Sequence, residues 1–159
     1  MEFAFNYNKQ KVIQALRLHF IAKKEIKAMI ILVNIFAIVS AILFYAKKIR
    51  PEPFLLGTAI WLIMLLAIWY LLPYSIYKKS NTFKDSFTIW INPQSIRLEN
   101  EKGYVVWQWN MFNRFFESPN FFHLYFNQKS FFLLPKDDIP QDITSELRTL
   151  LNEKLENKK

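Results

Sequence analysis

The chain has 159 residues, a formal net charge of +8, no cysteine and only 2 glycines. The lack of cysteine excludes a disulfide, a thiolate metal site and a cysteine nucleophile, and the scarcity of glycine excludes a Gly-rich phosphate loop. Residues 1–80 carry 11 Lys/Arg and 3 Asp/Glu, whereas residues 81–159 carry 10 of each. A nucleic-acid-binding domain concentrates its positive charge on the folded domain, so this distribution argues against a nucleic-acid partner.

The first segment, residues 1–27, is predicted to hold a short strand and a basic amphipathic helix. Residues 2–6 alternate in polarity, and Asn8 is a plausible N-cap for a helix over residues 9–27. The apolar side chains of that helix share one face: Val12, Ile13, Leu16 and Phe20. Such a helix either lies in a membrane interface or packs on the C-terminal domain, and the sequence leaves both alternatives open.

Two uncharged stretches of 19 residues follow, at 28–46 and 54–72, within a predicted transmembrane hairpin over residues 28–77. A helix of that length covers nearly the whole hydrocarbon core of a bilayer, about 30 Å. The alternative is a pair of buried helices in a soluble protein. The connecting loop has seven residues, so the two helices are expected to be antiparallel neighbours. Asn34 is expected to aid helix packing rather than to bind an ion.

Basic and aromatic residues gather at the ends of both stretches, where they are expected to meet lipid head groups. These predicted membrane-interface residues are Lys23, Lys24, Lys27, Lys47, Lys48, Arg50, Trp69, Tyr70, Tyr74, Lys78 and Lys79. The flanks outside the loop hold nine Lys/Arg and the loop holds three, which favours a two-pass protein with both termini in the cytoplasm.

Residues 81–159 form the third predicted segment, a small antiparallel β domain closed by a helix. Short runs that alternate apolar and polar residues are separated by turn sequences at Asn92-Pro93-Gln94, 100–103 and 127–129. Gly103 is free to adopt a positive φ in the second turn. Leucines and an isoleucine at helical spacing then predict a closing helix whose apolar face covers the sheet: Ile143, Leu147, Leu150, Leu151 and Leu155.

The segment from Trp109 onward resembles the C-terminal domain of the YcxB-like family. The resemblance is carried by Trp109-Asn110-Met111, Phe115-Phe116-Glu117, Phe121 to Tyr125, and Phe131 to Lys136, followed by the closing helix. The resemblance implies a protein of the bacterial inner (plasma) membrane and a β domain of pleckstrin-homology-like shape. The fold class predicted for the chain is therefore α+β, with a two-helix membrane hairpin and a small antiparallel β domain.

No residue pattern in the chain points to catalysis, so the protein is predicted not to be an enzyme and to need no metal or other cofactor. His19 and His123 lie on separate elements, and His123 is expected to be structural. Asp137-Asp138 is expected to cap the closing helix.

Aromatic residues make up 18% of the chain, which is more than a domain of about 80 residues is expected to bury. Four of them are candidates for an exposed interaction surface: Trp107, Trp109, Phe121 and Tyr125. The alternative is a small, crowded core. The leading functional hypothesis is a membrane-anchored, non-enzymatic module that recruits a membrane protein or its own copy. The second hypothesis is a small oligomeric subunit of a transporter or channel.

Overall fold

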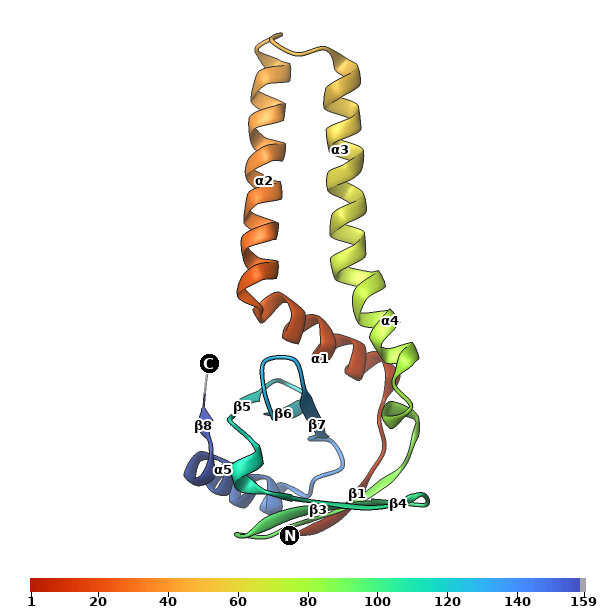
Figure 1. Ribbon diagram of the computed structural model, residues 1–159, viewed down its shortest axis with the longest axis vertical. Coiled ribbons are helices and arrows are strands. Elements are labelled where there is room, and N and C mark those ends of the chain that lie inside the picture. The colour runs from red at the N-terminus through yellow and green to blue at the C-terminus, as the bar shows by residue number, and fades with distance from the viewer. Residues whose placement is uncertain (158–159) are drawn as a thin grey trace. The chain divides into compact units, whose positions relative to one another are not determined.

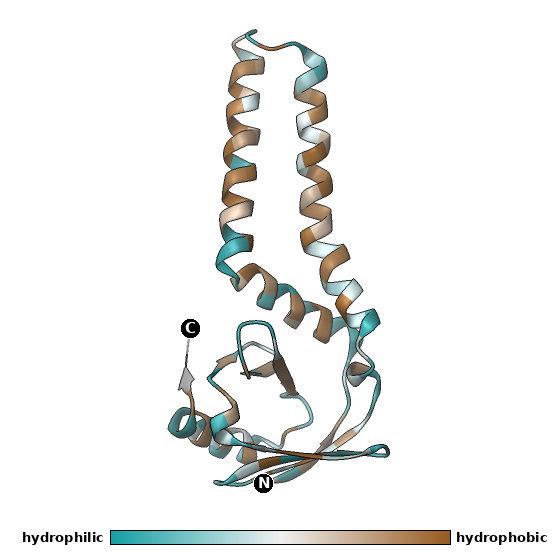
Figure 2. Ribbon diagram, viewed as in Figure 1, coloured by the Kyte–Doolittle hydropathy of each residue, from teal (hydrophilic) through white to brown (hydrophobic). Residues whose placement is uncertain are grey.

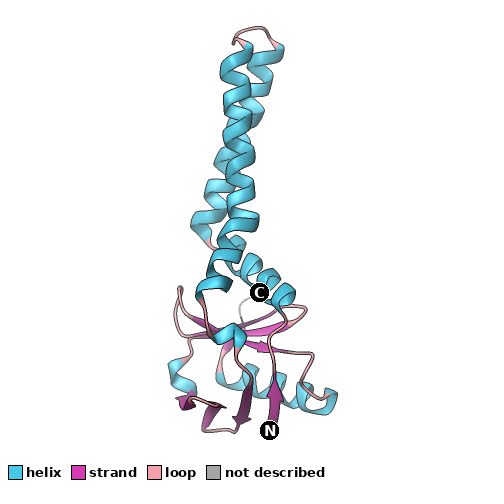
Figure 3. Ribbon diagram, turned by 90° about the vertical axis from the view of Figure 1, so that its right-hand side faces the viewer, coloured by secondary structure: helices cyan, strands magenta, loops and turns pink. Residues whose placement is uncertain are grey.

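The computed structural model describes residues 1–157 and divides the chain into two compact units. One unit combines residues 1–11 with residues 80–159, and is called the β unit here. The other comprises residues 12–79 and is called the hairpin unit. Figure 3 shows that the strands belong to the β unit, whereas the hairpin unit is helical. The sequence-based segmentation assigns the first strand to residues 1–27, but the structure pairs this strand with the strands of the β unit.

The hairpin unit is built from helices whose bounds follow the breaks in the sequence (Figure 1). They are α1 (Lys9–Ala22), which begins in the β unit, α2 (Lys24–Tyr45), α3 (Pro51–Leu66), a π-helical turn (Ala67–Leu71) and α4 (Leu72–Lys79). Asn8 caps α1 as predicted, because its Oδ1 accepts the backbone N–H groups of Gln10 and Lys11 at 3.0 and 3.3 Å. The helix predicted over residues 9–27 is interrupted at Lys23, whose backbone is extended.

Two helical stretches are long and apolar enough to cross a membrane, namely Lys24–Tyr45 and Pro51–Lys79. None of the residues in their most apolar 18-residue windows is buried. Figure 2 shows hydrophobic residues along nearly the whole length of α2 and α3. Asn34, in α2, donates its amide to the Ile30 carbonyl at 2.7 Å, so its polar group is satisfied within its own helix.

The turn at the end of α2 has the hydrogen bonds of a Schellman motif. The backbone N–H of Lys47 donates to the Phe44 carbonyl at 3.0 Å, and that of Lys48 donates to the Leu43 carbonyl at 2.9 Å. Lys47 occupies the position usually held by glycine, with φ of 54°. The rings of Phe44 and Phe54 stack at 4.4 Å where the two helices approach the loop.

The β unit contains two four-stranded sheets with the orders β1-β2-β3-β4 and β7-β6-β5-β8, called sheets A and B here. Adjacent strands pair antiparallel except for β5 and β8, which are parallel. The strands are β1 (Glu2–Phe5), β2 (Phe87–Ile91), β3 (Ser95–Asn100), β4 (Gly103–Gln108), β5 (Arg114–Glu117), β6 (Phe121–Tyr125), β7 (Phe131–Pro135) and β8 (Glu156–Asn157). Short 3₁₀ turns lie at Thr82–Lys84 and Trp109–Met111.

Asparagine side chains organise the turns that the sequence predicts. The Oδ1 atoms of Asn92, Asn100 and Asn127 each accept a backbone N–H two residues later. Gly103 has φ of 143°, a conformation that side chains with a Cβ rarely adopt, so the predicted positive φ is confirmed.

One hydrophobic core joins both sheets to the closing helix α5 (Gln141–Lys154). Alternate residues of the sheet A strands enter it, including Ile89 and Ile96, which are completely buried. From α5, Leu147 and Leu151 are also completely buried, and Ile143 and Leu150 pack at the margin. The predicted role of the closing helix is therefore confirmed.

We expect Leu147→Asp to destabilise the β unit by about 3–5 kcal/mol, because it places an unpaired charge in the core. Thr149→Asp is the matched control, since Thr149 is exposed on the same helix. Thermal unfolding and limited proteolysis of the purified variants would measure the difference. If Leu147→Asp resists protease as well as Thr149→Asp, α5 does not pack on the sheets.

Candidate functional site

The predicted membrane-interface residues lie in or beside the terminal turns of the two uncharged runs, 28–46 and 54–72. All of them are exposed except Lys23, which is half-buried and places its Nζ 5.0 Å from the centre of the Phe20 ring. Tyr70 and Tyr74 stack on each other with their ring centres 6.0 Å apart. The hairpin unit thus presents basic and aromatic groups where its uncharged surface ends.

A proline creates an unusual polar contact near one of these ends. Pro73 has no N–H to donate to the carbonyl of Trp69, four residues earlier, and its ring would clash with that carbonyl in a regular α-helix. The π-helical turn at Ala67–Leu71 lies at this position. Arg17 supplies a donor, with Nε 2.9 Å from the Trp69 carbonyl oxygen and its guanidinium 5.3 Å from the centre of the Trp69 ring.

We predict that Arg17→Leu lowers the stability of the hairpin unit by about 1–2 kcal/mol, because one hydrogen bond and one cation–π contact are lost. The loss should be smaller in a Pro73→Ala background, since that substitution restores a backbone N–H for the Trp69 carbonyl. A double-mutant cycle on thermal unfolding in detergent measures this coupling. An equal loss in both backgrounds would show that Arg17 does not compensate for the proline.

The predicted aromatic interaction surface is wrong for three of its four residues. Trp109, Phe121 and Tyr125 are buried, with exposed fractions of 7%, 2% and 5%. Trp109 donates its indole N–H to the Asn92 carbonyl at 2.9 Å and joins the core, and Trp107 is half-buried against that core. These rings therefore lie in a crowded core, which is the alternative that the sequence left open.

An exposed tyrosine, Tyr104, and a half-buried tryptophan, Trp90, lie instead on the side of sheet A that faces away from the core. This surface, called the outer face, is formed by Ala4, Thr88, Trp90, Arg97, Glu99, Tyr104, Val106 and Gln108. The Arg97 guanidinium lies 5.4 Å from the Trp90 ring centre and 4.5 Å from that of Tyr104. Its Nη2 also lies 2.7 Å from Glu99 Oε2. Arg97 on β3 thereby connects the ring of Trp90 on β2 with that of Tyr104 on β4, and these three residues are called the Arg97 ridge.

The exposed fractions of Tyr104 and Val106 are 68% and 48%. Both residues lie on β4, the outer strand of sheet A, so an apolar surface continues to the edge of the sheet.

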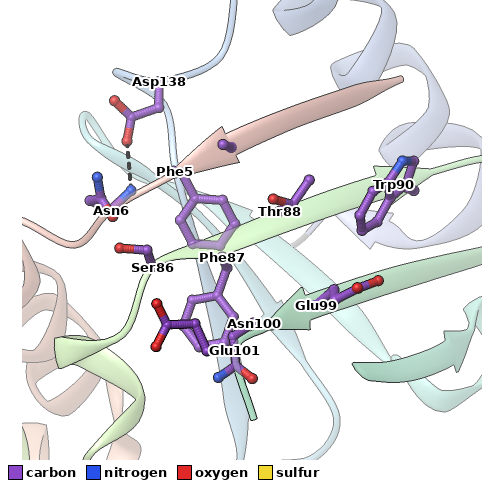
Figure 4. Close-up of a pocket in the computed structure, with 11 residues that line it drawn as sticks. Phe5, Asn6, Ser86, Phe87, Thr88, Trp90, Glu99, Asn100, Glu101 and Asp138 are labelled. Carbon is purple, nitrogen blue, oxygen red and sulfur yellow. Dashed lines mark hydrogen bonds between the residues drawn. The ribbon is translucent and has the colours of Figure 1, made fainter. Parts of the chain in front are cut away.

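An open hollow of about 410 Å³ adjoins the outer face and is lined by residues of β1, β2 and the end of β3 (Figure 4). Its walls include the carboxylates of Glu99, Glu101 and Asp138. Glu99 pairs with Arg97, and Asp138 accepts the backbone N–H of Asn6 at 3.1 Å. Two of these carboxylates therefore already stabilise the fold.

Asp137 and Asp138 do not cap α5, which corrects the sequence-based expectation. Pro140 occupies the N-cap position, and no side chain caps that end of the helix. Asp137 instead pairs with Lys11, and Asp138 binds the backbone at Asn6. The two carboxylates hold the N-terminal part of the β unit.

A second charged cluster, centred on Glu117, links β5 to α5 and to the residue that follows β7. Arg148 binds this carboxylate with two nitrogens, Nε at 2.9 Å and Nη2 at 2.8 Å, and Lys136 Nζ lies 2.7 Å from Oε1. Lys136 Nζ also donates to the Ser118 carbonyl at 3.3 Å. The hydrogen bonds from Arg148 lower the pKa of Glu117, and the hydrogen bond and positive charge of Lys136 lower it further, from 4.5 to about 2 in total. Partial burial of the carboxylate opposes this shift.

The lowered pKa predicts an acid-dependent contribution to stability. Because the folded-state pKa lies below the unfolded one, the contribution is present above about pH 4.5 and is lost as the pH falls toward about 2. Glu117→Gln should lower the free energy of unfolding by about 1–3 kcal/mol at neutral pH and by less near pH 3, where the same carboxyl is protonated in the unfolded chain. Glu146→Gln, on the exposed side of α5, is the control. A loss that is the same at both pH values would contradict this assignment.

The two histidines are both buried. His123 lies in the middle of β6 with Nε2 3.0 Å from Ser118 Oγ, in keeping with its predicted structural role. Among residues 1–157, no group of three or more His, Asp or Glu side chains could hold a metal ion.

The sequence interpretation missed Arg97, Arg17 and the Glu117 cluster. The alternation of strand residues provides a signal for Arg97, because Trp90, Arg97 and Tyr104 all have the phase opposite to the core residues. Pro73 provides a signal for Arg17, because it leaves the Trp69 carbonyl without the N–H of residue 73. The ion cluster has no local signal, since its members are 12 or more positions apart and meet only through the tertiary fold.

Comparison with known protein families identifies the C-terminal part of the chain. Residues 91–151 match the family described as YcxB-like protein. No curated protein and no solved structure matches the chain significantly. The matched segment begins at the end of β2 and includes the Glu117 cluster and most of α5. The resemblance to the YcxB-like family inferred from the sequence is therefore confirmed over residues 91–151.

Proposed function

We propose that this protein is a membrane-anchored, non-enzymatic interaction module. Its two apolar helical stretches cross the inner membrane of a bacterium, and its β unit binds a protein partner at the cytoplasmic surface. We also infer that the two sheets and the closing helix have a pleckstrin-homology-like shape. Support for this shape comes from the strand pairing within β1–β4 and β5–β7, followed by α5.

The observation that carries the proposal is the exposure of apolar side chains along the hairpin. Phe36 and Leu56 expose 70% and 65% of their surface, and more than a dozen other large apolar residues of α2 and α3 are also exposed. The helices satisfy their backbone polar groups internally, as a bilayer requires. In a bilayer, lipid hydrocarbon would surround these apolar side chains and remove their unfavourable contact with water.

The distribution of charge supports a separate binding role for the β unit. Residues 81–159 carry equal numbers of acidic and basic residues, so this part of the chain has no net attraction to anionic lipid. The outer face of sheet A exposes Tyr104 and Val106 beside the Arg97 ridge. Aromatic residues and arginine are enriched where proteins bind each other.

Labelling of single cysteines tests both the anchor and its orientation. The chain has no native cysteine, so Glu52→Cys reports on the loop and Asn157→Cys on the C-terminal region. In intact cells, an impermeant maleimide should label the thiol of Glu52→Cys and not that of Asn157→Cys, and inside-out vesicles should give the opposite result. Labelling of both variants in intact cells, or release of the protein by alkaline carbonate, would overturn the proposal.

The basic flanks should set this orientation. Replacing Lys23, Lys24, Lys27, Lys78 and Lys79 with Gln leaves four Lys/Arg on the terminal flanks against three in the loop. Each lysine near an anionic leaflet contributes about 1 kcal/mol, so the variant should insert in both orientations. The same two cysteine substitutions would measure the mixture. A single orientation would mean that the basic flanks do not determine topology.

The second hypothesis, an oligomeric subunit of a transporter or channel, makes a different prediction. Purified protein in liposomes would then conduct ions, and its oligomer would persist when the β unit is altered. The interaction module predicts no flux.

A further inference from the structure

We infer that strand β4 is a dimerisation edge, at which two copies of the chain join their A sheets by antiparallel pairing. The inference deepens the proposed function and rests on it, because it names a second copy as the partner. Anchoring both copies in one membrane would raise their effective concentration and favour a small interface.

The outer edge of β4 has no backbone partner among residues 1–157. β4 is the last strand of sheet A, and its ladder to β3 is the only one it makes in that range. Within the described part of the chain, no backbone hydrogen bond outside that ladder involves residues 103–108. An exposed strand edge of this kind is a template for another strand.

The hydrogen-bond pattern identifies which groups of β4 are available. The Asn92 N–H donates to the Ser95 carbonyl at 3.0 Å, so Ser95 and every second residue after it direct their backbone groups toward β2. The intervening residues of β3 bond β4 at positions 103, 105 and 107. The N–H and C=O groups of Tyr104, Val106 and Gln108 therefore point away from the sheet.

The backbone groups of these three residues are complementary to the same groups of a second copy related by a two-fold axis. With the axis at Val106, Val106 of one copy faces Val106 of the other, and Tyr104 faces Gln108 in both directions. Each of the three opposed pairs can exchange two backbone hydrogen bonds. Moving the axis to Val105 leaves only two such pairs, so the register centred on Val106 satisfies more groups.

Charge and side-chain character favour a second copy as the occupant. Residues 103–108 include no charged residue, so no like charges meet in the paired strands. The rest of the β unit adds little repulsion, since residues 81–159 are balanced.

The other outer strands carry features that discourage pairing. β1 has four residues and includes Glu2, β7 ends in Pro135, and β8 has two residues. Among these strands, β4 is the longest and lacks both charge and proline.

Disulfide cross-linking of the full-length protein in native membranes tests the register. The Cα atoms of a hydrogen-bonded antiparallel pair are about 5.5 Å apart, within the range of a disulfide. Two copies of the Val106→Cys variant should therefore cross-link under mild oxidation. Val105→Cys is the matched control, because Val105 is also exposed but lies diagonally from its own copy, beyond about 7 Å. We expect Val106→Cys to cross-link more than about tenfold faster than Val105→Cys.

A charge substitution tests the interface without cross-linking. Val106→Lys places two like charges opposite each other, whereas Val106→Thr keeps a neutral β-branched side chain. Light scattering of the detergent-solubilised proteins should give a dimer for wild type and Val106→Thr and a monomer for Val106→Lys. Near-ultraviolet circular dichroism checks that Val106→Lys remains folded.

The inference fails if wild type is monomeric, if Val105→Cys cross-links as fast as Val106→Cys, or if folded Val106→Lys remains a dimer. Retention of these variants in carbonate-washed membranes is measured in parallel. Membrane retention without cross-linking refutes the dimerisation edge and leaves the proposed anchor standing, whereas loss of membrane retention in wild type refutes the anchor itself.

Discussion

The uncharged surface of α2 and α3 is the constraint on which the rest of the hairpin depends. Side chains such as Phe36 are exposed, and the helical backbone satisfies its own polar groups. Several exceptions to that uncharged, internally bonded surface lie at an end of a helix or are compensated. Lys47 and Lys48 close the turn through their backbone N–H groups. Pro73 has no N–H to donate to the Trp69 carbonyl, four residues earlier, and that carbonyl accepts a hydrogen bond from Arg17.

The β unit is stabilised by a different set of interactions, centred on its own core. Both sheets and α5 contribute buried side chains to one cluster, and Glu117 links β5 to Lys136 and Arg148 at its margin. Because these interactions are internal, the outer face of sheet A is not needed for the core. Tyr104 and Val106 are consequently available for binding, which is how the fold connects to the proposed function.

Regular periodicity explains which parts of the fold were predictable. Strands with one buried face, such as β2 and β3, alternate clearly, and α5 has leucines at helical spacing. All five residues of β6 are buried, so its sequence does not alternate between apolar and charged residues, and the prediction that Phe121 and Tyr125 are exposed is wrong. The partners of Asp138 and Glu117 come from distant parts of the chain. Local patterns carry no information about such contacts.

The most direct test of the membrane account is the environment of individual side chains in a lipid bilayer. Nitroxide labels at Phe36→Cys and Tyr104→Cys would be compared in liposomes by electron paramagnetic resonance. The account predicts that oxygen relaxes the label at position 36 more strongly than a water-soluble nickel complex does, and that position 104 shows the reverse. Strong relaxation by nickel at position 36 would contradict it, since the middle of α2 would then lie in water.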